Sequence, residues 1–377
     1  MKPQSEAELA DVVRSADGPL AISGGGTRGV KVSGAALSLS ELSGITLYEP
    51  GALTFVAQAG TPVAEIEAAL ASENQRLAFE PMDARALMGT SGAPTLGGLI
   101  AANVSGPRRI QGGAARDYAL GVRFVDGTGA VVKNGGRVMK NVTGYDLVKL
   151  MCGSFGTLGV LSEVSLKVLP RPETQSTLML RHLDAQAAVT AMAAAMGSPY
   201  EITGAAHCGA LLDDGPVTAL RIEGFESSVN YRLAQLKELL SGFGAEMTVG
   251  DAEMSFWIWA KVRDVSLWAE VPGDVWCVSC RASQAPDLVA RAAPVGWILD
   301  WGGGRIWMRV PAGVDLRGTL GAYDGHATRV RGEGCDIARF EPEAPGVARL
   351  SQGLRARFDP RGMLNRGLMG PVADEVV

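Results

Sequence analysis

The sequence predicts a two-domain α+β protein, and three observations lead to this prediction. Residues 95–170 carry recurrent glycines, often in pairs, between short apolar segments of strand character. Pro170 and Pro172 then form a double-proline linker, after which strand-like and helix-like segments alternate. All seven tryptophans fall in the second region, between Trp257 and Trp307, which sets its composition apart from that of the first.

Composition and charge exclude several classes of protein. The chain has 377 residues, of which 47% are apolar and 20% charged, which is typical of a globular protein with room for two domains. The net charge of −5 gives no indication of the basic surface that nucleic-acid-binding proteins have. No apolar run reaches the roughly 18–20 residues of a membrane span, and the polar start MKPQSEAELADVV is unlike a signal peptide. We therefore expect a cytoplasmic protein that is peripheral to the inner membrane only through partners.

The cysteines favour reduced thiols over disulfides or a metal site. The number of cysteines is odd, and no secretory signal accompanies them. They are Cys152, Cys208, Cys277, Cys280 and Cys335. Cys277 and Cys280 have CxxC spacing, but a zinc or iron–sulfur site needs further ligands and there is no second pair. The surrounding sequence DVWCVSCR fits a strand, so we predict no metal.

Local patterns place the elements of the first region. Ser5 is a suitable N-cap for a helix over 5–15, and Thr61 for a helix over 61–73, with Pro62 in its first turn. A short helix is expected to start within 99–103. The predicted strands are Leu20–Ile22, Ile45–Tyr48, Thr54–Ala57, one that ends at 77–81, Gly121–Val125, Val131–Lys133 and Val160–Val168.

A glycine-rich loop follows the first strand and admits two interpretations. Gly24 to Gly29 match GxGxxG, and Glu49 falls about 20 residues later, as in a Rossmann dinucleotide fold. Residues 30–40, however, alternate apolar and small polar side chains and contain Gly34, which favours strand or loop over the long helix a Rossmann fold requires. We favour a turn between two strands, whose successive N–H groups form an anion-binding nest.

The glycines of 95–170 also admit two interpretations. Glycine allows positive φ and close approach of the backbone to a ligand, so strands with glycines at their ends suit a large anionic cofactor. The alternative is a Gly-rich β domain whose glycines only make turns and bulges.

A family resemblance favours the cofactor. The ordered motifs are Thr95–Gly98, Ala101–Asn103, Ser105-Gly106, Arg116–Gly121, Lys140–Asp146 (KNVTGYD), Gly153–Gly159 and Glu163. Together they resemble the FAD-binding domain of the vanillyl-alcohol oxidase/PCMH flavoprotein superfamily. Within it, Gly106–Arg109, KNVTGYD and the tail Phe358–Asn365 are similar to the FAD-binding E subunits of glycolate oxidase. The tail has Asn365-Arg366-Gly367 where that family often has Asn-Pro-Gly.

This resemblance implies the domains and the cofactor site. A PCMH-type, two-subdomain FAD-binding domain would span 1–170, an antiparallel-sheet α+β cap 171–349, and 350–377 would return to the FAD domain. The superfamily's covalent histidine has no counterpart in the glycine loop, so non-covalent FAD is expected. The implied FAD-binding residues are Ser23, Gly24, Gly25, Gly26, Thr27, Thr90, Ser91, Gly97, Gly98, Ala101, Asn103, Arg116, Asp117, Gly156, Gly159, Val160 and Asn365. Turn capping is the alternative role for Asp117 and for Asp146.

The second region is predicted to be an antiparallel sheet with helices on one face, built from two similar halves. Its helices are expected at 185–196, 228–243, 252–265 and 285–293, with Leu233, Leu236, Leu239 and Leu240 buried in the second. Strands are expected at 177–181, 217–223 and 275–281, and a hairpin at 297–301 with 305–310. The tryptophans fit core packing best, with a partner interface on this cap as the alternative.

The resemblance also implies a function: the FAD-binding subunit of a glycolate oxidase or dehydrogenase complex. Such a complex oxidises glycolate to glyoxylate and passes electrons through flavin to partners, here a second flavoprotein subunit and an iron–sulfur subunit. The alternative is a stand-alone FAD-dependent 2-hydroxy-acid (D-lactate-like) or alcohol oxidoreductase. Arg263 is a candidate for binding the substrate carboxylate, with a surface salt bridge as its alternative role. His182, His207 and His326 lie outside any recognisable motif, so the sequence assigns no catalytic base.

Overall fold

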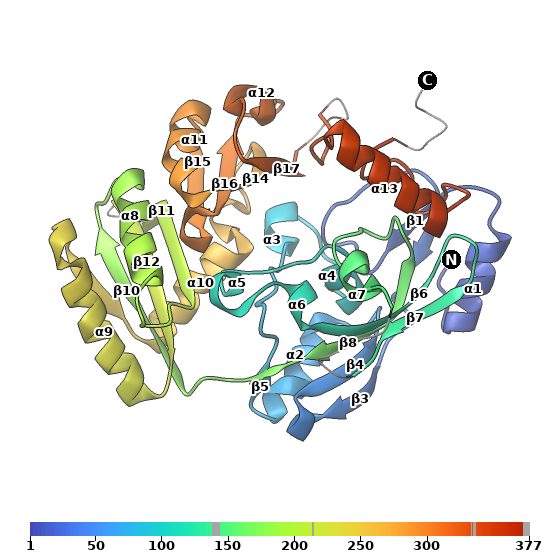
Figure 1. Ribbon diagram of the computed structural model, residues 1–377, viewed down its shortest axis with the longest axis horizontal. Helices are drawn as coiled ribbons and strands as arrows, with labels where there is room; N and C mark the ends of the chain where they lie inside the picture. Colours follow the sequence, from blue (N-terminus) through green and yellow to red (C-terminus); the bar gives the residue numbers. More distant parts are fainter. Residues whose placement is uncertain (138–143, 213–214, 333, 335–336, 372–377) are drawn as a thin grey trace.

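The computed structural model describes residues 1–137, 144–212, 215–332, 334 and 337–371. Two lobes lie side by side, with the N-terminal lobe and the helix α13 on the right of Figure 1 and the second lobe on the left. Lys140–Thr143 of the KNVTGYD motif, and Cys335, lie outside the described residues. No helix in the described ranges is both long and apolar enough to cross a membrane.

The N-terminal lobe contains a five-stranded antiparallel sheet in the order β3-β4-β8-β6-β7. The strands are β3 (Ile45–Glu49), β4 (Thr54–Gln58), β6 (Ala119–Val125), β7 (Val131–Gly135) and β8 (Val160–Lys167). All five were predicted to within two residues at each end, because alternating apolar residues and the turn at 50–52 mark them in the sequence. A separate parallel pair, β1 (Leu20–Ser23) and β2 (Ala35–Ser38), lies beside this sheet.

Short helices complete this lobe. Ser5 caps α1 (Glu6–Ser15) through a hydrogen bond from the Glu8 amide, as predicted. Its other helices are α2 (Val63–Ser72), α3 (Arg85–Met88), α4 (Leu96–Ala101), α5 (Arg109–Gly112), α6 (Ala115–Tyr118) and α7 (Leu147–Met151).

Three local predictions were wrong. Thr61 does not cap α2; its hydroxyl instead accepts from the Gly44 amide at 2.9 Å and donates to the Gln58 carbonyl at 2.7 Å. The expected strand at 77–81 is confined to β5 (Gln75–Arg76), which pairs with β9 (Leu169–Pro170). The helix expected to start within 99–103 begins at Leu96, because Thr95 caps it.

The second lobe is one eight-stranded sheet in the order β13-β10-β12-β11-β15-β16-β14-β17. Its first half is β10 (Thr174–Arg181), α8 (Ala185–Met196), β11 (Gly204–Leu212), β12 (Gly215–Gly224), α9 (Glu226–Leu240) and β13 (Met247–Gly250). Its second half is β14 (Asp274–Cys280), α11 (Ala285–Ala292), β15 (Gly296–Asp300), β16 (Arg305–Val310), α12 (Leu316–Leu320) and β17 (Gly325–Arg331). Each half is a split βαβ unit with the strand order fourth-first-third-second, so the prediction of two similar halves is confirmed.

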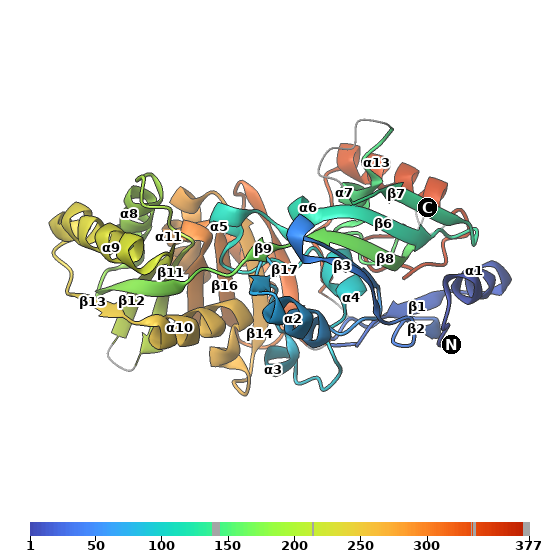
Figure 2. The same cartoon turned by 90° about the horizontal axis from the view of Figure 1, so that it is seen from below.

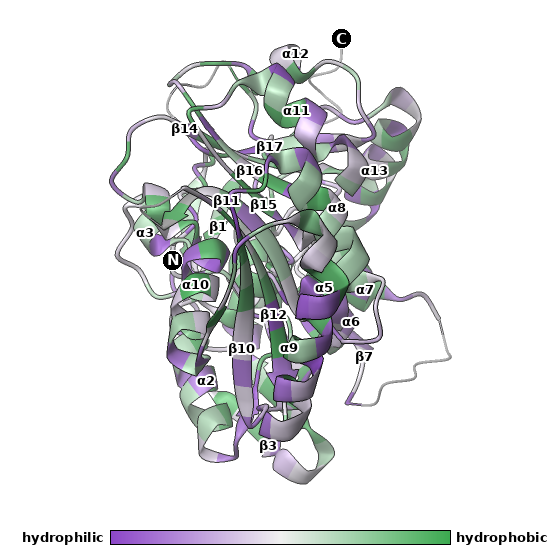
Figure 3. Ribbon diagram, turned by 90° about the vertical axis from the view of Figure 1, so that its left-hand side faces the viewer, coloured by the Kyte–Doolittle hydropathy of each residue, from purple (hydrophilic) through white to green (hydrophobic). Residues whose placement is uncertain are grey.

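The helices of this lobe cover both faces of the sheet, which corrects the prediction of a single covered face. α8, α9 and α11 lie on one side, and α10 (Ala252–Asp264) lies on the other (Figures 2 and 3). Along β10, Leu178 and Leu180 join the core under α8 and α9, whereas Met179 joins the core that α10 shares with the N-terminal lobe. Leu239 of α9 was predicted to be buried and is 45% exposed.

The tail returns to the N-terminal lobe. After α13 (Pro345–Phe358), the Leu20 amide donates to the Met363 carbonyl and the Asn365 amide to the Leu20 carbonyl, which lays the tail along β1. The tail at 363–365 therefore belongs to the same lobe as β1.

The interface between the lobes is polar and buried. Arg305 of β16 donates to the Ser105 carbonyl at 2.8 Å and lies over the Trp301 ring, 4.0 Å from its centre. The Trp301 indole N–H in turn donates to the Gly106 carbonyl at 3.0 Å. Trp301 thus makes contacts within the chain, while a partner interface on the tryptophan-rich cap stays a prediction. Core packing is confirmed for four of the tryptophans: Trp259, Trp268, Trp276 and Trp307.

Candidate functional site

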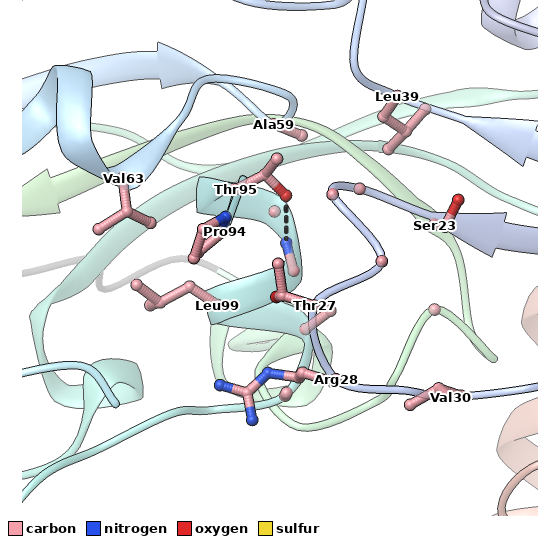
Figure 4. Close-up of a pocket in the computed structure, with 18 of the residues that line it drawn as sticks. Ser23, Thr27, Arg28, Val30, Leu39, Ala59, Val63, Pro94, Thr95 and Leu99 are labelled. Carbon is pink, nitrogen blue, oxygen red and sulfur yellow. Dashed lines mark hydrogen bonds between the residues drawn. The ribbon is translucent and has the colours of Figure 1, made fainter. Parts of the chain in front are cut away.

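A cavity of about 260 Å³ opens beside the glycine loop, and several segments of the N-terminal lobe line it (Figure 4). The main ones are the loop after β1, residues 81–85, the α4 region at 94–102, residues 155–161 and the inner side of α2. Asn365 of the tail closes one wall, and Arg263 of α10 is the contribution of the second lobe. The cavity therefore lies where the two lobes and the tail meet.

The glycine loop does not open a helix. Residues 24–34 run as a loop from β1 directly to the parallel β2, so the Rossmann alternative is wrong. Within the described chain, the amides of residues 24–28 donate no hydrogen bond to any other group. Successive backbone N–H groups without partners form a concave donor site for an anion, as a phosphate-binding nest does.

Two glycines in this loop are required by packing. A Cβ on Gly25 would lie 1.6 Å from the Ala93 carbonyl oxygen, and a Cβ on Gly24 would lie 2.0 Å from the Thr95 hydroxyl. The loop therefore rests directly on the segment before α4. Gly26 differs, because its φ is +69° while a Cβ there would meet nothing within 4 Å. Gly24 and Gly25 position the loop, and Gly26 gives it its turn at the cavity.

Asn365 connects three segments around the cavity. Its Oδ1 accepts from the Ile22 amide at 2.8 Å, and its Nδ2 donates to the Phe155 carbonyl at 2.7 Å. Its side chain is almost fully buried, and its own φ is +44°. Asn365 thus fixes β1, the 155–161 segment and the tail relative to one another.

The structure brings most of the predicted cofactor residues together. Twelve of them line the cavity: Ser23, Gly24, Gly25, Gly26, Thr27, Gly97, Gly98, Ala101, Gly156, Gly159, Val160 and Asn365. Thr90 and Ser91 line a shallower neighbouring hollow instead, with Asp83, Arg85 and Asp264. The Thr90 hydroxyl donates to the Thr27 carbonyl at 3.0 Å, so it helps to fix the backbone of the glycine loop.

Three predicted cofactor residues, Asn103, Arg116 and Asp117, do not line the cavity. The Asn103 side chain accepts from the Arg116 amide at 3.0 Å. The Asp117 carboxylate accepts from the Ala114 amide at 2.8 Å, the turn-capping role that was weighed for it. Asp146 likewise caps α7 through the Lys149 amide. The sequence motif at 116–121 thus contributes local hydrogen bonding here.

Arg28 is the functional candidate that sequence reasoning missed. Its side chain lines the cavity, and its guanidinium makes no hydrogen bond or ion pair with any described residue (Figure 4). Burial, together with repulsion from Arg339, lowers the pKa of Arg28 to about 10, so it stays charged at neutral pH. Its position directly after the glycine loop was the available signal, because a cation there complements a bound phosphate.

Arg263 is placed at the cavity but is already paired. Its Nε and Nη2 donate to the two oxygens of Asp264 at 2.8 and 2.7 Å. The Nε–Nη2 edge of the guanidinium is therefore occupied, and the Nη1–Nη2 edge keeps N–H groups that Asp264 does not use. The surface salt bridge that was the alternative role is present, although the pair is mostly buried.

Two carboxylates line the cavity, and their environments differ. Burial raises the pKa of Glu67 on α2, against the partial effect of Arg263 and Arg171. Asp83 is also partly buried, but its hydrogen bonds from Arg85 prevail and lower its pKa. Glu67 is thus the better proton acceptor of the two.

The histidines and cysteines lie elsewhere. His207 is buried in β11, bonded to the Thr218 hydroxyl at 2.8 Å, and burial lowers its pKa to about 4. No histidine is among the described residues that line the cavity. Cys277 and Cys280 both lie in β14, as predicted from the DVWCVSCR pattern, and Cys152, Cys208, Cys277 and Cys280 are free thiols.

Comparisons with known proteins identify the family of this chain. Residues 1–135 match the family model of the FAD binding domain. The chain is 35% identical over 357 residues to glycolate oxidase subunit GlcE of Escherichia coli (strain K12), covering 93% of this chain and 92% of that protein. It is 42% identical over 94 residues to glycolate oxidase subunit GlcD of Bacillus subtilis (strain 168), which is 25% of this chain and 20% of that one.

The fold is also found among solved structures. p-Cresol methylhydroxylase with bound substrate superposes with a TM-score of 0.73 at 13% identity, covering 100% of this chain and 89% of that chain. At that identity the likeness shows the fold alone, and it is the fold that the sequence motifs predicted. The near full-length match shows more, and the chain belongs to the GlcE family of FAD-linked oxidoreductases.

Proposed function

We propose that this chain binds FAD non-covalently in the cavity beside the glycine loop and serves as the FAD-binding subunit of a glycolate-oxidising complex. The observation that carries the proposal is the row of unpartnered amides at residues 24–28 next to the unpaired guanidinium of Arg28. Together they offer a pyrophosphate both backbone donors and a positive charge. The domains of this proposal are 1–170 for FAD, 171–349 for the cap and 350–377 for the returning tail.

The walls of the cavity fit the remaining parts of FAD. Gly97, Gly98 and Ala101 present a wall with little or no side chain, suited to the ribityl chain and ring edge. Gly159 and Val160 also line the cavity and would lie on the side toward the adenine. Among the described residues, the cavity lining holds no histidine, cysteine or tyrosine that would attach a flavin covalently. Asn103, Arg116, Asp117, Thr90 and Ser91 would act by supporting these segments.

The reaction requires a hydride acceptor, a base and an electron acceptor. FAD, when bound in this cavity, would supply the hydride acceptor for glycolate. The residues around it would hold glycolate, and a base must take the hydroxyl proton as glyoxylate forms. Two electrons must then leave the flavin. Because the chain belongs to the GlcE family, we assign the final electron transfer to partners, a second flavoprotein subunit and an iron–sulfur subunit. The complex would be cytoplasmic, and any contact with the inner membrane would come through those partners.

A second candidate function is supported by Glu67. This carboxylate lines the cavity with a raised pKa near Arg263, whose Nη1 is not used by Asp264. A base and a carboxylate-binding cation are what a stand-alone 2-hydroxy-acid oxidoreductase needs. In that case the isolated chain would oxidise glycolate or a D-lactate-like substrate by itself.

One experiment separates the two candidates. The purified chain, loaded with FAD, is mixed with glycolate without oxygen, alone and again in the reconstituted complex, while the visible flavin absorbance is followed. Bleaching only in the complex supports the proposed function. Rapid bleaching of the chain alone that is lost in Glu67→Gln supports the stand-alone enzyme, provided that it is kept in the control Glu65→Gln, a residue of the same helix that is not among the cavity-lining residues. No bleaching in either preparation contradicts both.

A further inference from the structure

α13 carries its apolar side chains on the outside. Val347, Leu350 and Leu354 are 51%, 72% and 39% exposed, and their spacing places them on one face of the helix. No residue within α13 is buried. An isolated helix of this length is marginal in water, so a face that packs against nothing contributes no stability to it.

The side of α13 that faces the N-terminal lobe is the more polar one. The half-buried residues of the helix are Ala348, Ser351, Gln352, Arg355 and Phe358. Ser351 donates to Glu343 at 2.9 Å, and Arg355 donates to the Gly370 carbonyl at 3.3 Å. Surface helices ordinarily turn their apolar stripe inward and their polar face outward. α13 reverses this order along most of its length, which indicates that its outer face is covered by something else.

The charges beside the stripe indicate what covers it. Arg349 and Arg357 are exposed on α13, and neither forms an ion pair or hydrogen bond with any described residue. Both arginines lie on the same side of the apolar stripe, and their exposed guanidinium groups complement a surface with an apolar centre and acidic groups at its rim. The positions 347, 350 and 354 are also the anchor spacing of a helix that binds in a groove of another protein.

We propose that the Val347–Leu350–Leu354 face of α13 is the docking surface for another protein subunit whose contact site is an apolar groove with an acidic rim. This inference rests on the proposed function, because it assigns the surface through which the FAD-binding chain joins its complex. A protein groove fits better than a lipid surface. The stripe is three aliphatic residues wide and has none of the bulky aromatic anchors that membrane-surface helices present.

The test is co-purification of the co-expressed complex on a tagged copy of this chain. The double variant Leu350→Glu/Leu354→Glu is compared with Leu239→Glu, a leucine of α9 that is 45% exposed and lies at the far end of the molecule (Figure 1). The double variant is expected to retain about tenfold less of the partner subunits, which corresponds to a loss of about 1.4 kcal/mol of binding free energy. The Leu239 control and the flavin content of both proteins are expected to be unchanged. Arg349→Glu/Arg357→Glu is expected to weaken retention most at low salt.

Several outcomes would overturn the proposal. Full retention of partners by the leucine double variant would show that the interface lies elsewhere. If the wild-type chain alone forms a dimer that the double variant abolishes, the occupant is a second copy of this chain. If it binds vesicles containing anionic lipid and the double variant does not, the occupant is a membrane. A wild-type chain that retains no partner would instead contradict the proposed function, and this inference would fail with it.

Discussion

Arg221 of β12 and Glu80 of the N-terminal lobe form a bidentate ion pair across the interface between the lobes, with N–O distances of 2.8 and 2.9 Å. The Arg221 guanidinium also lies over the Trp259 ring of α10, 4.6 Å from its centre. Glu223, two residues along the same strand, receives two hydrogen bonds from Arg108 and one from Arg76. This network fixes the second lobe, and with it Arg263 of α10, against the cavity.

The first prediction concerns the free energy of unfolding. Glu80→Gln removes one charge of a buried pair and leaves Arg221 with Glu223, at 3.9 Å, as its remaining acidic neighbour, so we expect a loss of about 3 kcal/mol. The exposed pair Arg281–Asp324 is the control, and Asp324→Asn should change stability by less than about 1 kcal/mol. Urea denaturation measures both. Equal effects of the two variants would contradict the importance given to the interface network.

The second prediction concerns pH. Burial alone would raise the pKa of Glu80, but Arg221 and Arg108 outweigh it and lower the pKa from 4.5 to about 2. Glu223 is shifted in the same direction by Arg221 and Arg108. Because the folded pKa is depressed, the stabilisation is complete above about pH 5 and is lost as pH falls toward 2. Denaturation midpoints measured over this range should fall steeply in the wild type and less in Glu80→Gln; parallel curves would show that these carboxylates are not responsible.

The third prediction concerns the glycine loop. Gly25→Ala places a methyl group where the Ala93 carbonyl lies, so the loop must move. We expect the free energy of unfolding to fall by about 1–3 kcal/mol. The displaced amides should then hold less flavin, measured as the ratio of visible to protein absorbance. Gly18→Ala is the control, since a Cβ there meets nothing within 4 Å. An unchanged flavin ratio in Gly25→Ala would remove this loop from the cofactor site.

The fourth prediction concerns the two arginines of the cavity wall. Arg28→Met removes an unpaired charge, whereas Arg85→Met removes one that is already bonded to Asp83. A charge-assisted hydrogen bond contributes about 1.5–3 kcal/mol, so Arg28→Met should raise the FAD dissociation constant by roughly ten- to a hundredfold. It should also reduce the dependence of binding on salt. Arg85→Met should do neither, and equal dissociation constants for the two variants would argue against phosphate binding by Arg28.

Many elements of this fold could be predicted because residues close together in the sequence determine them. Ser5 before an acidic first turn gives α1, and alternating residues give β4, β6 and β8. The ordered motifs located the cavity wall at Gly97, Gly98 and Gly156, although the packing role of Gly25 depends on Ala93, which is distant in sequence.

The errors share a physical cause, which is competition from tertiary contacts. Thr61 has the right residue type for a cap, but the Gly44 and Gln58 backbone groups engage its hydroxyl. β11 was missed because GAAHCGALL is rich in small residues and has little strand character of its own. The Glu80–Arg221 pair joins residues 141 positions apart, so no local pattern could reveal it. Arg28 is absent from the residues predicted from the sequence, because that prediction used the glycines of the loop and did not include the arginine that follows them.

The visible spectrum of the purified chain, taken before and after acid precipitation, shows most directly whether the chain binds FAD and whether the bond is covalent. We expect a flavin band in the native protein that passes entirely into the supernatant, because the amides of 24–28 and Arg28 hold FAD without a covalent bond. A yellow pellet would contradict non-covalent binding. A well-folded, colourless protein that takes up no added FAD would contradict the assignment of the cavity as a cofactor site.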